Sequence, residues 1–199
     1  MTPFTVVSGP AVALDRANID TDQIIPARFL RKSRAEGYNN FLFHDVRLSE
    51  PDFPLGPSGS PEILVAGANF GCGSSREGAV YALGDAGVRC VIAPGFGDIF
   101  AGNAGKNGLL TVVLPEERCA ELRAAAASGA DITVDLPNQQ VRAANSVYAF
   151  EIDPFRKRCL LEGLDDIGLT LKHRAEIEAF EQRMANETPW SQRADASSL

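Results

Sequence analysis

The segment Gly67 to Leu83, GANFGCGSSREGAVYAL, combines glycines, hydroxyl groups and charges in a pattern suited to binding an anion. It follows the apolar run EILVAG and precedes residues with helical spacing, so it predicts a strand, a glycine loop and a helix N-terminus. Free backbone N–H groups and the helix dipole favour an anion at such a junction. Gly71 and Gly73 allow close backbone approach, and the guanidinium of Arg76 suits a carboxylate. Because the segment lacks a GK[ST] ending and a GxGxxG pattern, we expect a small carboxylate rather than a nucleotide phosphate.

The same segment also fits a structural interpretation. Ser74-Ser75-Arg76-Glu77 has the S-x-x-E pattern of a capping box, which would start a helix at Ser74. The two interpretations are compatible, because N–H donation to the Ser74 oxygen favours its anionic form. A serine in that position, beside Arg76, could therefore act as a base.

Other residues with reactive side chains are less informative. Asp20 and Asp22, in NIDTDQIIPARF, could bind a metal or act as acid and base, but we favour a turn in which they cap N–H groups. We expect His44 to be packed and His173 to be inert in an exposed helix. Cys72 lies in the glycine loop, but with only two histidines in the chain a cysteine–histidine pair is not expected.

Composition limits the class of protein. The chain has 199 residues, of which 45% are hydrophobic and 23% charged, which is typical of a globular protein. Its net charge of −7 argues against binding to nucleic acid, and no apolar run approaches the about 20 residues of a membrane span. The N-terminus lacks the pattern of an export signal, and the four cysteines are too scattered for a disulfide framework or a metal site. We therefore expect a cytoplasmic protein with no metal ligands of its own.

Strand-length apolar runs alternate with helical segments through the middle of the chain. Strands are expected at 62–67, 89–94 and 109–115, a strand or hairpin at 4–14, a meander at 131–153, and helices at 74–86, 116–129, 154–163 and 171–186. This order predicts an α/β fold with a mostly parallel central sheet flanked by helices and with additional antiparallel strands. We expect one domain over 1–186 and a disordered tail over 187–199.

Five segments, found in this order, carry a family resemblance. They are NIDTDQIIPARFL, GYNNFLFHDVR, NFGCGSSRE, CVIAPGFGDIF and GLDDIGLTL. From about residue 4 to about residue 180, the chain resembles the small subunits of 3-isopropylmalate dehydratase (isopropylmalate isomerase) in the aconitase superfamily. GSSRE alone is typical of the superfamily.

The resemblance implies a swivelling β/β/α domain that closes over a separate large subunit, which holds a [4Fe–4S] cluster. The two chains would form a heterodimer or heterotetramer and act on a small dicarboxylate. The implied hydro-lyase reaction interconverts 2-isopropylmalate and 3-isopropylmalate through isopropylmaleate, in leucine biosynthesis. Elimination of water needs a Lewis acid at the hydroxyl and a base at the adjacent carbon, so a chain with a base and no metal should be inactive alone.

The resemblance also implies roles for individual residues. Ser74 would remove the proton α to a carboxylate, while Arg76, with N–H groups of Ser74 and Ser75, would hold a substrate carboxylate. The segment 26–45 corresponds to the family's substrate-sensing loop, and whether it is ordered without the large subunit is left open. Further substrate-binding candidates are Asp22, Arg28, Phe29 and Leu30, and the supporting candidates are Asp20, Gly71, Gly73 and Glu77.

The chain departs from the family pattern near these motifs. Gly78 stands where SSREHA has histidine, Gly95 and Gly97 alter APSFADIF, and Lys106 lies in an altered GNSFNNQLL segment. Two alternatives therefore stay open, namely a paralogous hydro-lyase for another substituted malate, such as a methylmalate, and a non-catalytic partner of a large subunit. The intact serine, arginine and aspartate residues argue against the second.

Overall fold

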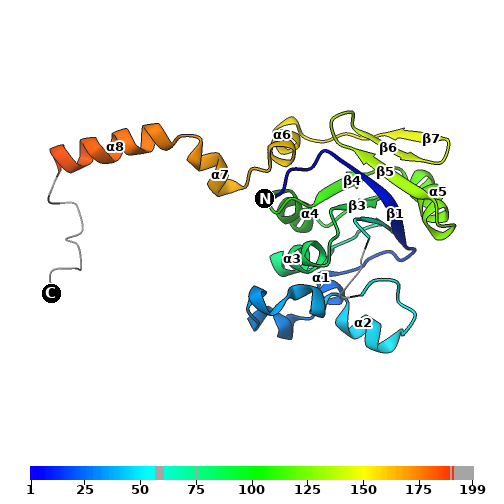
Figure 1. Cartoon of the computed structure of the whole chain (residues 1–199). Coiled ribbons are helices and arrows are strands. Elements are labelled where there is room, and N and C mark those ends of the chain that lie inside the picture. The colour runs from blue at the N-terminus through cyan, green and yellow to red at the C-terminus, as the bar shows by residue number, and fades with distance from the viewer. Residues whose placement is uncertain (57–60, 75, 189, 191–199) are drawn as a thin grey trace. The chain divides into compact units, whose positions relative to one another are not determined.

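The computed structural model describes residues 1–56, 61–74, 76–188 and 190, and it divides into two compact units, Met1–Gly163 and Leu164–Leu199. The first unit contains a seven-stranded sheet in the order β4-β3-β2-β1-β5-β6-β7 (Figure 1). The strands are β1 (Val6–Leu14), β2 (Ile63–Ala66), β3 (Cys90–Ala93), β4 (Leu110–Val113), β5 (Asp131–Asp135), β6 (Gln140–Ala143) and β7 (Ser146–Ala149). Its α-helices are α1 (Thr21–Ile24), α2 (His44–Ser49), α3 (Glu77–Asp85), α4 (Asp98–Lys106), α5 (Glu116–Ala127) and α6 (Pro154–Glu162), and its 3₁₀-helices are η1 (Ala27–Arg31), η2 (Arg34–Glu36) and η3 (Tyr38–Phe41).

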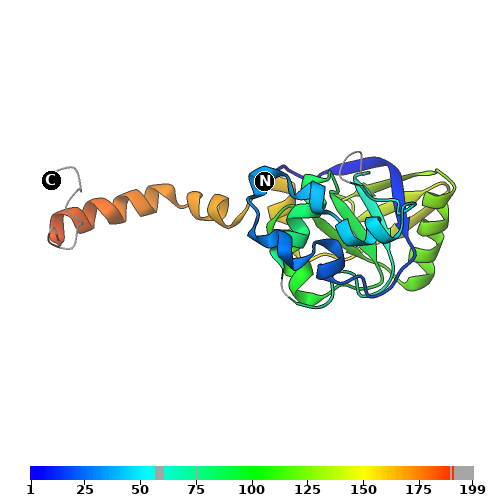
Figure 2. The same cartoon turned by 90° about the horizontal axis from the view of Figure 1, so that it is seen from below.

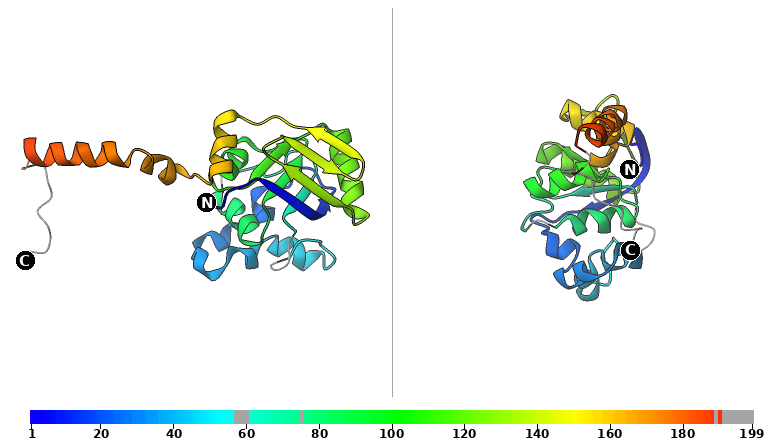
Figure 3. Two further views of the ribbon diagram at one scale, coloured as in Figure 1. Left: turned by 45° about the horizontal axis from the view of Figure 1, so that its top comes forward. Right: turned by 90° about the vertical axis from the view of Figure 1, so that its left-hand side faces the viewer.

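Strand β1 joins a parallel and an antiparallel part of the sheet. Its residues 11–14 pair in parallel with β2, whereas residues 6–10 pair antiparallel with β5. Beyond β2, strands β3 and β4 continue the parallel part, and the chain reaches each through a helix. Figure 3 shows β5, β6 and β7, in green to yellow, continuing the sheet on the other side of β1. The predicted α/β class, with a parallel core and antiparallel strands, is confirmed, and the segment 4–14 contains one strand, Val6–Leu14, rather than a hairpin.

The parallel strands are buried on both faces. All four residues of β2 and all four of β3 are buried, as expected where helices cover both sides of a sheet. Leu64 and Val91 lie in a core cluster with side chains of α3 and α4, whereas Ile63 and Ile92 lie in a second cluster with side chains of α5. Because successive strand residues point to opposite faces, each short strand contributes to both clusters.

The segment 15–56 forms a further layer on α3. It consists of α1, the three 3₁₀-helices and α2, and Figures 1 and 2 show it, in blue to cyan, on the side of α3 that faces away from the sheet. Ile25, Tyr38, Leu42 and Phe43 are buried and belong to the same core cluster as Leu83 of α3. The residues between 27 and 50 lack a clean apolar period because several short turns, rather than one long helix or strand, place their side chains.

The start of α3 differs from the prediction. The helix begins at Glu77 and its N-cap is Arg76, without a capping bond from a side chain of the described residues, so the predicted capping box with Ser74 as N-cap is wrong. The carbonyl oxygen of Ser74 instead accepts a hydrogen bond from Thr21 Oγ1 at 2.9 Å. The carbonyl of Ser74 therefore faces the loop that follows β1. Ser75, predicted to bind substrate, lies outside the described residues.

The second unit contains α7 (Asp166–Leu171) and α8 (Arg174–Glu187). The carboxylate of Asp165 caps α7 by accepting the N–H of Gly168 at 2.6 Å. The predicted helix at 171–186 corresponds to α8, within a few residues at each end. One domain over 1–186 stays a prediction, and most of the expected tail at 187–199 lies outside the described residues. Within the described ranges, no helix is both long enough and apolar enough to cross a membrane.

Candidate active site

The loops that follow β1 and β2 run side by side beyond the carboxyl ends of these strands. The N–H of Gly71 donates to the carbonyl of Ile19 at 2.7 Å, and the N–H of Thr21 donates to the carbonyl of Cys72 at 3.0 Å. In parallel α/β sheets, ligands bind at this end of the strands. The pairing brings together the two segments that the sequence marked separately, the DTD turn and the glycine loop.

The loop after β3 lies on the other side of the glycine loop. The N–H of Phe70 donates to the carbonyl of Gly95, and the N–H of Gly97 donates to the carbonyl of Phe70, each at 3.0 Å. Gly71 has a φ of +72°, and a Cβ at this position would lie 2.3 Å from Cγ of Phe100. Only glycine adopts this φ easily and also leaves room for Phe100, so a glycine at this position allows the loop to pass close to α4. Gly73 also has a positive φ, +87°.

Arg76 connects the glycine loop to the DTD turn that contains Asp20 and Asp22. Its Nε donates to Ser74 Oγ at 3.2 Å, and its Nη1 pairs with the Oδ1 of Asp22. The arginine side chain is only 16% exposed, whereas that of Asp22 is 55% exposed. Asp22 Oδ1 also accepts the N–H of Ala27 at 3.3 Å, which ties the next turn of the chain to the same carboxylate. Since a positive charge beside a hydroxyl favours its deprotonated form, this arrangement could support an anionic serine oxygen.

Asp20 and Asp22, the two aspartates of the DTD turn, bind different partners. Asp20 caps α1 by accepting the N–H of Gln23 at 2.7 Å, as the turn interpretation predicts. Asp22 accepts a backbone N–H as well, but its pairing with Arg76, 54 positions along the chain, is not visible in the local pattern. The middle residue, Thr21, was not singled out from the sequence. Thr21 is buried, and its hydroxyl donates a hydrogen bond to the carbonyl of Ser74. Its position between Asp20 and Asp22 is the one feature of the sequence that could have identified it.

Glu77 lies at the first position of α3 and binds a neighbouring helix end. Its Oε1 accepts a hydrogen bond from Asn107 Nδ2 at 2.8 Å. The pKa of the Tyr81 hydroxyl, one turn further along the helix, is raised mainly by burial and further by the negative charge of Glu77. Glu77 therefore orients the start of α3 and does not contact Ser74 through any bond found among the described residues.

Arg28, Phe29 and Asp45 form a group between η1 and α2. Arg28 Nη1 donates to Asp45 Oδ2 at 2.8 Å, and hydrogen bonds from this guanidinium hold the pKa of the Asp45 carboxyl well below its usual range. His44 Nδ1 lies 2.9 Å from Asp45 Oδ1, and its ring packs on Phe29. Phe29 also stacks on Phe41, with centroids 4.3 Å apart. These side chains hold one another and connect η1 to α2, and the N–H of Ala27 in η1 binds the Asp22 carboxylate that pairs with Arg76.

The remaining candidate residues do not form a reactive cluster. Cys72 is half-buried in the glycine loop, and His173 precedes α8 with its side chain mostly exposed beside Glu176. Cys90 and Cys119 lie in the core, where burial raises the pKa of both thiols, that of Cys119 to about 11. In the part of the chain that the structure describes, no three or more His, Cys, Asp or Glu side chains gather as a metal site.

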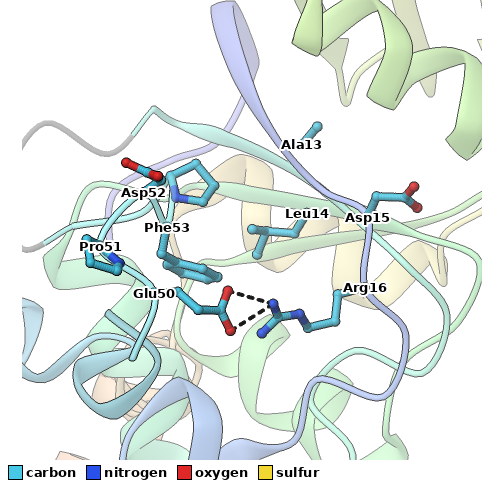
Figure 4. Close-up of a pocket in the computed structure, with 9 residues that line it drawn as sticks. Ala13, Leu14, Asp15, Arg16, Glu50, Pro51, Asp52 and Phe53 are labelled. Atoms are coloured by element: carbon cyan, nitrogen blue, oxygen red, sulfur yellow. Dashed lines mark hydrogen bonds and ion pairs between the residues drawn. The ribbon is translucent and has the colours of Figure 1, made fainter. Parts of the chain in front are cut away.

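A cavity of about 450 Å³ lies at the end of β1, away from these residues (Figure 4). Two of its four charged side chains pair with each other, because Arg16 Nη2 donates to both carboxylate oxygens of Glu50, at 3.0 and 2.8 Å, and Asp15 and Asp52 also line it. Phe53 lies beside this ion pair, with its ring centroid 5.9 Å from the guanidinium carbon. None of the candidate site residues lines the cavity, so we place the candidate site at the Ser74 and Arg76 loop instead.

Comparison with protein families first gives the class. The family described as "Aconitase C-terminal domain" matches residues 56–117, which hold the glycine loop, α3 and the strands beside it. This part of the chain is therefore similar to the C-terminal domain of aconitases. The family that describes the C-terminal domain of 3-isopropylmalate dehydratase small subunits matches residues 166–194, and one described as LeuD_N matches 120–154.

Full-length relatives narrow the class to a family. A 3-isopropylmalate dehydratase small subunit of Paramagnetospirillum magneticum is 48% identical, over 96% of this chain and 100% of the relative. One from Rhodospirillum rubrum is 50% identical, over 96% and 97%. The crystal structure of 3-isopropylmalate dehydratase (leuD) from Methanocaldococcus jannaschii superposes with a TM-score of 0.68 at 28% identity, covering 88% of this chain and 99% of that one. The chain belongs to the family of 3-isopropylmalate dehydratase small subunits, and the predicted family is confirmed.

Proposed function

We propose that this chain supplies the base and the carboxylate clamp of a hydro-lyase that interconverts 2-isopropylmalate and 3-isopropylmalate through isopropylmaleate. One observation carries the proposal: Arg76 Nε donates to Ser74 Oγ at 3.2 Å, which puts a permanent positive charge beside the candidate base. Family membership supports the choice of substrate and of the pathway, leucine biosynthesis. We place the reaction in the cytoplasm, which the four free thiols support.

Ser74 acts on the carbon next to a substrate carboxylate. Its oxygen, as the alkoxide, takes the proton from this carbon, and the electrons of the broken C–H bond form the double bond. The hydroxyl leaves the adjacent carbon as water, with a second proton that an acid outside this chain supplies. Addition of water in the opposite orientation returns the proton from Ser74 to the other carbon and gives the isomer. The serine side chain is exposed, which leaves it accessible to a substrate held between two subunits.

Arg76 holds the carboxylate that activates the reacting carbon. A guanidinium has five N–H donors, so the contacts with Ser74 and Asp22 leave capacity for a substrate carboxylate. Asp22 is the more exposed partner and can move aside or share the guanidinium when a dicarboxylate arrives. In this proposal the Ser75 N–H contributes to the same clamp, although Ser75 lies outside the described residues.

The enzyme is completed by a separate large subunit. The cysteines of this chain do not fit a cluster, because Cys90 and Cys119 are buried in the core with raised thiol pKa values. We therefore assign the [4Fe–4S] cluster to the large subunit, where it supplies the Lewis acid that assists departure of the hydroxyl. The two chains form a heterodimer or a heterotetramer, and this chain is inactive alone.

The test is anaerobic co-purification with the large subunit encoded nearest in the genome, followed by an ultraviolet assay of isopropylmaleate formation from 2-isopropylmalate. We expect turnover with both chains and none with either alone. A tight complex that acts on methylmalate but not on isopropylmalate would support the paralogous hydro-lyase that Gly78 keeps open. A tight complex without turnover on any malate would support a non-catalytic partner, and the lack of a complex would refute the proposal.

A further inference from the structure

Thr21, the middle residue of the DTD turn, is bonded to the glycine loop through both its backbone and its side chain. Its N–H donates to the carbonyl of Cys72 at 3.0 Å, and its hydroxyl donates to the carbonyl of Ser74 at 2.9 Å. The two acceptors lie on either side of Gly73, whose φ is +87°. One residue therefore holds both ends of the short bend that leads into Ser74.

The hydroxyl of Thr21 extends a short ladder of backbone hydrogen bonds between the two loops. The ladder contains the N–H of Gly71, which donates to the carbonyl of Ile19, and the N–H of Thr21, which donates to that of Cys72. At Thr21 the chain turns into α1 and its backbone leaves the glycine loop. A side chain therefore supplies the next bond, to the carbonyl of Ser74 two residues further along.

The donor of this bond is shielded from water. Thr21 is only 2% exposed, whereas Ser74 is exposed. A buried hydroxyl that turned away from its acceptor would be left unsatisfied, which costs free energy and disfavours other positions of the threonine side chain. The bond from Thr21 therefore gives a fixed anchor to the backbone of an otherwise exposed serine.

The same turn also holds the arginine beside Ser74. Asp22, the next residue after Thr21, pairs with Arg76 Nη1, and Arg76 Nε donates to Ser74 Oγ at 3.2 Å. Thr21 thus holds the backbone of the serine, and Asp22 holds the guanidinium. Because these two residues are adjacent at the start of α1, the position of the serine oxygen relative to the positive charge depends on one short element.

We propose that Thr21 is a positioning residue for the base, because its hydroxyl holds the backbone of Ser74 so that Oγ stays within hydrogen-bonding distance of Arg76 Nε. The inference rests on the proposed function, since it takes Ser74 to be the base. Thr21 acts through Ser74 and is not itself a catalytic group. Without the hydroxyl, the Ser74 carbonyl bonds to water and Oγ spends less time beside the guanidinium. A misplacement of about 1 Å in an active site costs about 10²-fold in rate.

The test compares Thr21→Val with Thr21→Ser in the reconstituted pair, with 2-isopropylmalate as substrate. Valine keeps the shape of threonine without the hydroxyl, whereas serine keeps the hydroxyl. We expect Thr21→Val to lower kcat by about 10–100-fold. Its KM should stay within about threefold of the wild-type value, because Asp22 still holds the arginine that binds the carboxylate. Thr21→Ser should restore most of kcat.

Thr133→Val is the matched control. Thr133 Oγ1 shares a hydrogen bond of 2.6 Å with Ser8 Oγ, between β5 and β1, so this variant also loses a threonine hydroxyl bond but should keep the wild-type kcat and KM. Urea unfolding shows whether each variant is folded in the assay, and Thr21→Ala takes the place of Thr21→Val if the latter is not. A wild-type kcat without the hydroxyl, or an equal loss in Thr21→Ser, would overturn the inference.

A second measurement needs no activity. The Nε–H proton of Arg76 is observed by NMR on the full chain, and its signal is identified by its absence in Arg76→Lys. Ser74→Ala removes the acceptor and gives the exchange rate with water that corresponds to a lost bond. We expect Thr21→Val to raise the exchange of this proton several-fold, towards that of Ser74→Ala, and Thr21→Ser and Thr133→Val to leave it near the wild-type rate.

The two measurements separate the inference from the proposed function. If the exchange follows this pattern while the wild-type pair acts on no malate, or while Ser74→Ala keeps full turnover, the proposed function fails. The geometric part of the inference, that Thr21 holds Ser74 beside Arg76, then stands. If the exchange is unchanged in Thr21→Val, the inference fails whatever the activity.

Discussion

Replacement of Gly71 by alanine should destabilise the first unit through two separable effects. At a φ of +72°, an L-residue costs about 1–2 kcal/mol relative to glycine. The new methyl group would also overlap the Cβ, Cγ and Cδ2 atoms of Phe100, at 2.7, 2.3 and 2.6 Å. Phe100 cannot move away easily, since it is buried and packs on Phe70 and Phe96 with centroids 5.4 and 6.3 Å away.

Overpacking of this kind costs about 1–3 kcal/mol, so we expect a total loss of about 2–5 kcal/mol in the free energy of unfolding. Gly73→Ala is the matched control, because Gly73 has a similar φ of +87° but its Cβ would lie 3.5 Å from Asp20 Cβ, an ordinary contact. This control should lose only the conformational part, about 1–2 kcal/mol.

Urea unfolding of the full chain, monitored by circular dichroism, gives the free energy of unfolding of both variants and of the wild type. The argument needs Gly71→Ala to be the more destabilised by about 1–3 kcal/mol. Equal losses in the two variants would refute the conclusion that Phe100 excludes a side chain at position 71, and with it the close approach of the glycine loop to α4.

Four further predictions concern the site and its supports. In the reconstituted pair, Ser74→Ala should lower kcat by about 10²–10⁴-fold while the unfolding curve stays unchanged, and full turnover would contradict its role as base. Arg76→Lys should raise KM about tenfold or more, measured by steady-state kinetics, because lysine cannot reach Ser74, Asp22 and a carboxylate together. The pKa of Asp45 is lowered in the folded protein, chiefly by its contact with Arg28. This contact therefore contributes its full stabilisation of η1 and α2 above the unfolded pKa of about 3.9, and the stabilisation is lost as the pH falls towards the folded pKa. The protection of residues 27–45 against hydrogen exchange, corrected for the intrinsic exchange rate at each pH, should therefore fall in acid, and Asp45→Asn should remove this pH dependence. Arg123→Met should cost about 1–3 kcal/mol in urea unfolding, because the buried Arg123 Nη1 donates to the carbonyl of Ala66 at the end of β2.

The parallel core could be predicted from the sequence because each strand is buried on both faces. Such strands appear in the sequence as continuous apolar runs, here EILVAG and RCVIAP. A run of this kind indicates a buried strand even when the strands that pair with it are not known. The residues of the site were marked for a similar reason, since glycine, serine and arginine in one loop already suggest an anion. Residues 4–14 were harder to interpret, because the pattern of β1 reflects two different neighbours, β2 and β5.

Two features of the site could not be predicted because they depend on contacts between distant segments. The ion pair of Arg76 with Asp22 spans 54 positions, and the burial of Gly78 under Leu30 spans 48. The capping box failed for the same reason. The hydroxyl oxygen of Ser74 accepts from Arg76 Nε, whose side chain Asp22 also binds, and the helix begins at Glu77.

The position of β1 in the sheet has a consequence during synthesis on the ribosome. Residues 6–10 pair only with β5 in the described sheet, and Ser8 and Thr133 are 125 positions apart. At about 5–20 residues per second, the partner of this half-strand emerges about 6–25 s later. Until then, the nascent chain carries an unpaired strand edge of the kind that associates with other chains. The first strand made is thus among the last to be completed.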